Sequence, residues 1–296
     1  MPNLPYSYIP RFRRTRMPAI LVAAFLIGCS APVPRPIGPA RDYDDAKDMF
    51  KRGRFDRALD FTDGLAKAVP PTSHTERAQV LRVIIYSGMM QGYKTLVDAY
   101  AKGYVATMDA RVQAEFKRIS GDYLYTGAQA SLGLAEAARQ LTEGSKIAKQ
   151  LTLEAPYPST EGPLEVTQLN RVKDGGWIEA NEQEAAALDA QRKGIDDALA
   201  AAVGGDRSKA RSALTAGPVK LDGVDFCLFI GKQLLDAFVF FDRKHLMDSQ
   251  KLGLLSNQAD EAANAALALL KQNPNKDKEK AVKKLQDQIK ATLKAI

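Results

Sequence analysis

Few side chains in this sequence are of the types that carry out chemistry, and they are far apart. There are two cysteines, Cys29 and Cys227, and two histidines, His74 and His245. Two separated histidines do not predict a multi-histidine metal site, and a lone histidine without a placed partner does not predict proton transfer. Cys227 lies among phenylalanines, where a cysteine is usually an unreactive core residue. The remaining candidate is Cys29, which directly follows an apolar stretch.

Catalytic sequence motifs are not found. The sequence has no G-x-S-x-G, no H-E-x-x-H, no C-x-x-C and no P-loop. Acidic pairs such as Asp44-Asp45 and Asp196-Asp197 lie in segments predicted to be helical, so we interpret them as solvated helix faces. The sequence therefore favours a protein that is not an enzyme, and it offers no catalytic or metal-binding residues. The alternative is an enzyme whose active site is assembled from dispersed residues, which leaves no local motif.

Residues 1–28 have the organisation of an export signal. A basic stretch, RFRRTR, covers residues 11–16, and an apolar stretch of eleven residues, MPAILVAAFLI, covers residues 17–27. A helix needs about 20 apolar residues to span a bilayer core of about 30 Å, so this stretch is too short to be a membrane anchor. It is typical of a cleaved signal peptide.

The end of this segment, Leu26-Ile27-Gly28-Cys29, resembles the lipobox of bacterial lipoproteins. The resemblance implies that the Cys29 thiol carries a diacylglyceryl thioether, that cleavage occurs before Cys29, and that the new amino terminus is acylated, as with palmitate. Two or three acyl chains hold a protein on a membrane, whereas one binds marginally. We therefore expect a lipid-anchored protein with no cofactor apart from the covalent lipid. The alternative is an ordinary signal peptide with a chance cysteine.

Residues 29–41 are expected to form a tether between the lipid and the folded domain. The stretch APVPRPIGPA at 31–40 contains four prolines, which favour an extended chain of about 3 Å per residue. Ser30 follows the cysteine, where an Asp commonly favours inner-membrane retention in Gram-negative lipoproteins. The resemblance thus favours the outer membrane, facing the periplasm, if the host is Gram-negative.

The charge of the chain gives no indication of a nucleic-acid partner. The net charge is +7, but residues 1–28 contain four of the 42 basic residues and none of the 35 acidic ones. The rest of the chain has 38 basic and 35 acidic residues, or +3. A domain so close to neutral lacks the basic field of a nucleic-acid-binding protein. If Cys29 is acylated, Cys227 is the one remaining thiol, and no intramolecular disulfide can form.

From residue 42 onward the sequence predicts an all-α fold. Good helix formers dominate, and the period-two alternation of strands is essentially missing. We expect antiparallel helical hairpins over 42–275, stacked as a TPR-like α-solenoid or as an irregular helical-repeat domain. The expected helical segments are a pair within 42–70, then 76–101, 109–142 with a break near Gly121, a short piece ending at Leu153, 179–203, 207–214, 225–245 and 276–296.

Residues 42–70 resemble one tetratricopeptide repeat (TPR). A small residue at Ala46, a turn at Gly53-Arg54-Phe55, the pair Ala58-Leu59 and the closing Pro70 have the spacing of that family. The sequence departs from the pattern at Asp42, where the family has an aromatic residue. Part of the pattern returns near the end of the chain, at Ala262, Ala266, Leu269, Leu270 and Pro274.

Two segments contain candidate binding residues. The stretch 154–176 is expected to be a non-helical loop insertion, and Trp177 follows it as either an anchor of the loop to the core or a partner contact. Residues 225–245 hold five of the eleven phenylalanines, including Phe229 and Phe238. They form either a buried core helix or the apolar wall of a ligand groove.

Residues 276–296 predict an amphipathic, lysine-rich helix that caps the repeat domain or contacts anionic headgroups. The whole pattern favours a cell-envelope scaffold or protein-binding module, such as an accessory subunit of an envelope assembly or transport complex. Lipoproteins of that kind include the TPR lipoprotein of the outer-membrane barrel-assembly machine. The alternative is a periplasmic carrier of a small hydrophobic ligand, as in the T-component lipoproteins of TRAP transporters. The expected partners are the membrane, through the lipid, and an unidentified envelope protein.

Overall fold

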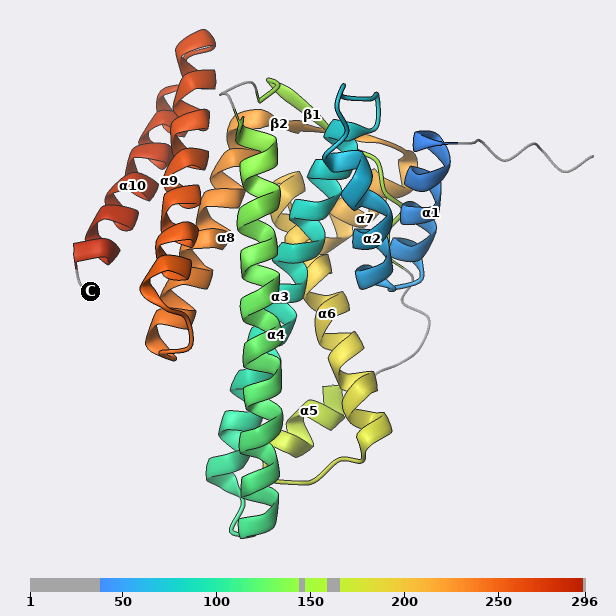
Figure 1. The fold of residues 1–296 in the computed structure, drawn as a ribbon, viewed down its shortest axis with the longest axis vertical. Coiled ribbons are helices and arrows are strands. Elements are labelled where there is room, and N and C mark those ends of the chain that lie inside the picture. The colour runs from blue at the N-terminus through green and yellow to red at the C-terminus, as the bar shows by residue number, and fades with distance from the viewer. Residues whose placement is uncertain (1–37, 144–146, 159–165, 295–296) are drawn as a thin grey trace, which may run out of the picture. The chain divides into compact units, whose positions relative to one another are not determined.

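The computed structural model describes residues 38–143, 147–158 and 166–294, which belong to one compact unit. Within these ranges the chain forms ten helices and one two-stranded sheet (Figure 1). The all-α fold class is therefore confirmed. The elements are α1 (Pro39–Lys51), α2 (Phe55–Ala66), α3 (Thr75–Ala106), α4 (Ala110–Thr142), β1 (Gln150–Leu153), α5 (Val166–Lys173), α6 (Ala180–Val203), α7 (Arg207–Ala216), β2 (Val219–Asp222), α8 (Gly223–Arg243), α9 (Ser249–Gln272) and α10 (Lys276–Lys294).

Helices α1 and α2 form a tight hairpin in the segment that resembles a TPR. Gly53 makes the turn with a φ of 74°, a conformation that glycine adopts without steric cost. Phe50 and Phe55, on either side of the turn, pack edge to face with ring centroids 5.6 Å apart. Helix α1 begins at Pro39, three residues earlier than the sequence suggested, because the fixed φ of proline suits the first turn of a helix.

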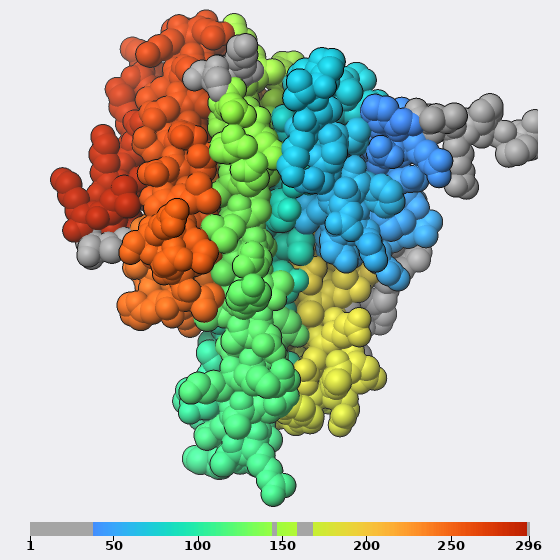
Figure 2. Space-filling view, viewed as in Figure 1, coloured from blue at the N-terminus to red at the C-terminus, as the bar shows by residue number. Residues whose placement is uncertain are grey.

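Helix α3 is the centre of the fold. It contacts α2, α4, α5, α6 and α8, and most of its circumference is buried. Its antiparallel neighbour α4 is continuous through Gly121, so the expected break is wrong. One glycine costs a helix interior about 1 kcal/mol, which flanking helix formers and tertiary packing can offset. In Figure 2, α4 forms a surface ridge between α9 and α2.

The helices pack around α3 instead of each pair contacting only the pairs next to it in sequence. Helix α6 lies against α3 although about 100 residues separate them. The two backbones touch where Gly88 meets Gly194, since a Cβ built on Gly194 would overlap the carbonyl oxygen of Gly88. Of the two expected arrangements, this is the irregular helical domain.

The small sheet was not expected. Strands β1 and β2 are antiparallel, with Leu151 opposite Leu221 and Leu153 opposite Val219. The expected helical piece ending at Leu153 is therefore wrong. A four-residue apolar stretch does not distinguish a strand from a helix, and its pairing partner lies far along the chain. The segment expected to be non-helical also contains helix α5.

Helices α8, α9 and α10 pack side by side at the C-terminal end of the chain (Figure 1). The apolar edge of α10 is buried by contact with α8 and α9, through Val282, Leu285 and Ile289. Helix α10 therefore covers these two helices with its apolar edge and faces solvent with its lysines. Within the described ranges, no helix has both the length and the apolar character that crossing a bilayer requires.

Candidate binding groove

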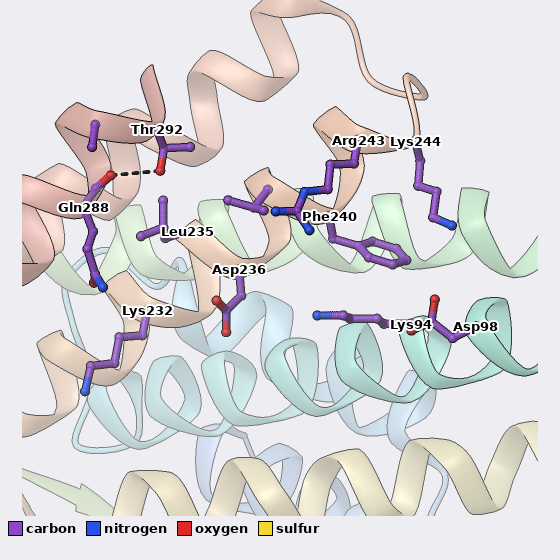
Figure 3. Close-up of a pocket in the computed structure, with 12 residues that line it drawn as sticks. Lys94, Asp98, Lys232, Leu235, Asp236, Phe240, Arg243, Lys244, Gln288 and Thr292 are labelled. Atoms are coloured by element: carbon purple, nitrogen blue, oxygen red, sulfur yellow. Dashed lines mark hydrogen bonds between the residues drawn. The ribbon is translucent and has the colours of Figure 1, made fainter. Parts of the chain in front are cut away.

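A groove of about 880 Å³ lies between α3, α8 and α10 and is open to solvent along one side (Figure 3). Its floor is apolar, because Leu235 and Phe240 are buried and Val239 is half-buried. Its rim is polar and mostly exposed. The rim consists of Lys94, Asp98, Lys232, Asp236, Arg243, Lys244, Gln288 and Thr292, and Ala291 completes the lining.

Helix α8 contributes most of the groove. Its N-cap residue is Asp222, whose carboxylate accepts hydrogen bonds from the backbone N–H groups of Val224 and Asp225. One face of α8 holds the buried phenylalanines of the core. The opposite face carries Lys232, Asp236 and Arg243, spaced by four and seven residues, which places charged groups along one side of the helix.

The basic side chains of the rim have no acidic partner in the part of the chain that the structure describes. Lys94, Lys232, Arg243 and Lys244 form no ion pair there, although two carboxylates, Asp98 and Asp236, lie in the same groove. Lys278, elsewhere on the surface, shows the contrast. Its ammonium lies 2.9 Å from Asp222 and 2.8 Å from Asp225. The groove therefore has an excess of two positive charges and leaves its four cations available to a ligand.

Two lysines hold their charges beside one aromatic ring. The Nζ atoms of Lys94 and Lys244 lie 5.3 Å and 5.6 Å from the centroid of the Phe240 ring. Figure 3 shows the ring between these two side chains. A cation over an aromatic face at an exposed site contributes about 0.5–1 kcal/mol. This contact favours conformations in which both ammonium groups stay at the edge of the apolar floor.

Asp236 lies among these cations without touching them. The walls of the groove partly bury its carboxylate, which raises its pKa, and the charges of Lys94 and Lys232 lower the pKa by less. The side chain remains accessible to solvent. The carboxylate is thus more easily protonated than a fully solvated one, which reduces its repulsion of an anionic ligand at acidic pH.

The residues singled out from the sequence are not part of this groove. Phe229 and Phe238 are 5% and 2% exposed and lie in the core, so neither offers a surface to a partner. Trp177 is 38% exposed, and its indole stacks on Phe116. This contact matches the interpretation of Trp177 as an anchor, while its exposed edge still permits a partner contact. Leu26, Ile27, Gly28 and Cys29 lie outside the described residues.

Sequence reasoning missed the groove because its residues come from three separate helices. The available signal was on α8, where Lys232 and Asp236 interrupt an aromatic segment at helical spacing. The contribution of Lys94 from α3 depends on the packing of α3 on α8, which no local pattern encodes. The described residues contain no cluster of three or more potential metal ligands.

Comparison with known proteins identifies no relative of this chain. No protein-family model matches the chain, no curated protein matches it, and no solved structure matches it. The class that the structure itself defines is an all-α domain of antiparallel helix pairs with a basic, open groove on its surface.

Proposed function

We propose that this chain is a lipid-anchored cell-envelope protein that serves as a helical scaffold or binding module for another envelope protein. The observation that carries the proposal is the groove between α3, α8 and α10, where four cations with no ion-pair partner among the described residues surround an apolar floor. An apolar centre with a polar rim is the usual anatomy of a protein-binding surface. A rigid helical body that presents such a surface is suited to hold a partner in place.

The membrane anchor is supported by the sequence Leu26-Ile27-Gly28-Cys29 and by the proline-rich stretch after it. Attachment to a membrane would raise the concentration of the binding module near membrane-bound partners. The test is to replace Cys29 with serine and fractionate the cells. The wild type should sediment with membranes and be released by detergent. If the serine variant is membrane-bound to the same extent in a cleaved form, the lipid anchor is wrong.

Carriage of a small hydrophobic ligand is the second candidate. The volume of the groove is within the range of about 300–1,000 Å³ for small-molecule sites, which favours it. Two features favour the scaffold instead. The groove is open along one side, and Phe229 and Phe238, which would line the site of such a carrier, are packed in the core.

Site-specific photo-crosslinking in intact cells tests the binding function. Benzoylphenylalanine is introduced at Val239 in the groove, at Trp177, and at Lys117, an exposed position on α4 outside the groove, as a control. We expect a discrete protein adduct at Val239 or Trp177 and none at Lys117. The absence of a protein adduct at both test positions, with the chain correctly membrane-bound, would contradict the scaffold function.

A further inference from the structure

We propose that the groove between α3, α8 and α10 binds an acidic peptide segment of the partner protein, with one apolar side chain of that segment on the floor formed by Leu235, Val239 and Phe240. This inference rests on the proposed function, because it identifies the part of the partner that the binding module recognises. Three properties of the groove support it, namely its shape, its charge and its floor.

The shape of the groove suits a segment of a longer chain. Sites for small molecules are concave and enclose about 70–90% of the ligand surface. This groove is open to solvent along one side, where Figure 3 shows Lys232 and Gln288 near one end and Phe240 with Lys244 near the other. An occupant would therefore keep one side in solvent and could continue beyond both ends of the groove. A peptide that is part of a larger protein meets this requirement.

The charges of the groove favour an acidic occupant. Lys94, Lys232, Arg243 and Lys244 have no ion-pair partner among the described residues, so binding an anion breaks no existing pair. The guanidinium of Arg243 can bind a carboxylate through two parallel hydrogen bonds. The ammonium groups of Lys94 and Lys244 are held beside the Phe240 ring, which limits the entropy that they lose on binding.

The floor favours an occupant that also has an apolar side chain. Leu235 and Phe240 are each 9% exposed, so the small surface that they offer is a shallow patch between charged groups. A purely ionic ligand would leave this patch hydrated. One aliphatic or aromatic side chain of a peptide would cover it and place its flanking acidic residues beside the cations of the rim.

A membrane surface is the less favoured occupant. Helix α10, one wall of the groove, buries Val282, Leu285 and Ile289 against α8 and α9, so that Leu293 is the one large apolar side chain that the described part of this helix exposes to a lipid surface. The apolar floor lies below a charged rim, where a flat layer of headgroups would not reach it. Anionic lipid is nevertheless included in the experiment, because headgroups share the charge of an acidic peptide.

The experiment measures binding of the full lipidated chain, in non-ionic detergent, to an array of immobilised short peptides. The peptides contain one phenylalanine or leucine flanked by increasing numbers of glutamates, and matched peptides have glutamine at each glutamate. The proteins compared are the wild type, Lys94→Glu, Arg243→Gln and Lys117→Glu. Lys94 and Arg243 form no ion pair among the described residues, so these variants are expected to fold, and circular dichroism checks that they do.

The proposal predicts that wild-type binding increases with glutamate number and falls when the apolar residue is replaced by serine. Lys94→Glu and Arg243→Gln should each weaken binding about tenfold, which is about 1.4 kcal/mol. Lys117→Glu, which has the same change of charge as Lys94→Glu, should bind like the wild type. Added phosphatidylglycerol should displace the peptides no more than phosphatidylcholine does.

Three results would overturn the inference. In the first, glutamine peptides bind as well as glutamate peptides, which would show that the groove does not select acidic residues. In the second, Lys117→Glu weakens binding as much as Lys94→Glu, which would show that binding depends on the net charge of the protein and not on the groove. Phosphatidylglycerol could displace the peptides selectively, which would identify the groove as a headgroup site. None of these results would contradict the scaffold function itself. That function is tested by photo-crosslinking, because benzoylphenylalanine at Trp177 can detect a partner that binds outside the groove.

Discussion

The indole of Trp177 stacks on the ring of Phe116, with centroids 5.9 Å apart and an angle of 13° between the planes. Phe116 is fully buried near the start of α4, whereas Trp177 is 38% exposed just before α6. The pair therefore ties the beginning of α6 to α4 at the end of the long α3–α4 hairpin. The same contact leaves one edge of the only tryptophan in the chain open to solvent.

Replacing Trp177 with alanine is expected to lower the free energy of unfolding by about 1–2 kcal/mol, because it removes an aromatic pair and exposes Phe116. Urea unfolding followed by circular dichroism measures the change. Trp177→Phe is the control and should recover most of the loss, since a smaller ring can still stack. An alanine variant as stable as the wild type would show that the stack does not hold this segment. A partner contact of this residue would instead appear as a protein adduct of benzoylphenylalanine placed at position 177.

The backbone contact between α3 and α6 leads to a second prediction. Gly194→Ala should destabilise the protein by about 1–3 kcal/mol, because the new Cβ would meet the carbonyl oxygen of Gly88, which cannot move without separating the helices. Gly121→Ala is the control, since a Cβ at Gly121 has no neighbouring atom within 4 Å outside its own helix turn. Alanine there should stabilise α4 by about 0.5–1 kcal/mol. Thermal unfolding of both variants measures the two changes in stability. If Gly194→Ala changed the stability no differently from Gly121→Ala, the close approach of the α3 and α6 backbones would be contradicted.

Local sequence patterns encode the long helices and the first turn of this fold but not the pairing of its two strands. Helices such as α3 and α6 were predictable because their helix formers and apolar residues recur over many turns. The turn at Gly53 was predictable because glycine there is needed for a positive φ. Strands β1 and β2 were missed because each has four residues and their pairing joins segments about 70 residues apart.

The candidate groove was less accessible to sequence reasoning than the fold. The phenylalanines of 225–245 indicated a buried helix, and the structure places Phe229 and Phe238 in the core accordingly. The polar residues on the other face of the same helix became significant only once α3 and α10 were seen beside it. A surface assembled from three helices depends on their packing, and a single sequence does not contain that information in local form.

The third prediction concerns Asp236 and pH. Partial burial raises the pKa of Asp236, so the folded state binds a proton more tightly than the unfolded chain does. The stabilising contribution of protonation is present below the unfolded pKa of about 3.9 and is lost as the pH rises through the raised folded pKa. Asp236→Asn should therefore equal the wild type in stability at low pH and become slightly more stable near neutral pH. Unfolding free energies at several pH values test this, and the opposite trend would be evidence against burial as the cause.

The same variant changes the groove. An uncharged amide in place of the Asp236 carboxylate would leave four cations and one acidic residue, Asp98, so the acidic peptides should bind more tightly to Asp236→Asn at neutral pH. The gain should shrink as the pH approaches that at which wild-type Asp236 is itself protonated. Lys117→Gln, which alters a charge outside the groove, should not change the affinity in this way. If Asp236→Asn bound the acidic peptides with the same affinity as the wild type, the peptide would not lie beside Asp236.

The fourth prediction concerns the reactivity of the two cysteines. Reactivity at Cys227 tests the packing of α8, and reactivity at Cys29 tests the lipid anchor. Cys227 is fully buried, and burial raises the pKa of its thiol to about 12, so the folded protein should not react with a maleimide at pH 7. A thioether on Cys29 cannot react at all. The mature protein should therefore take up no maleimide when folded and one when unfolded in urea, as measured by mass spectrometry. Cys227→Ser should take up none in either state. Labelling of the folded protein at Cys29 would contradict lipidation. Labelling of the folded protein at Cys227 would contradict the packing of α8. The mass of the labelled peptide shows which of the two cysteines has reacted.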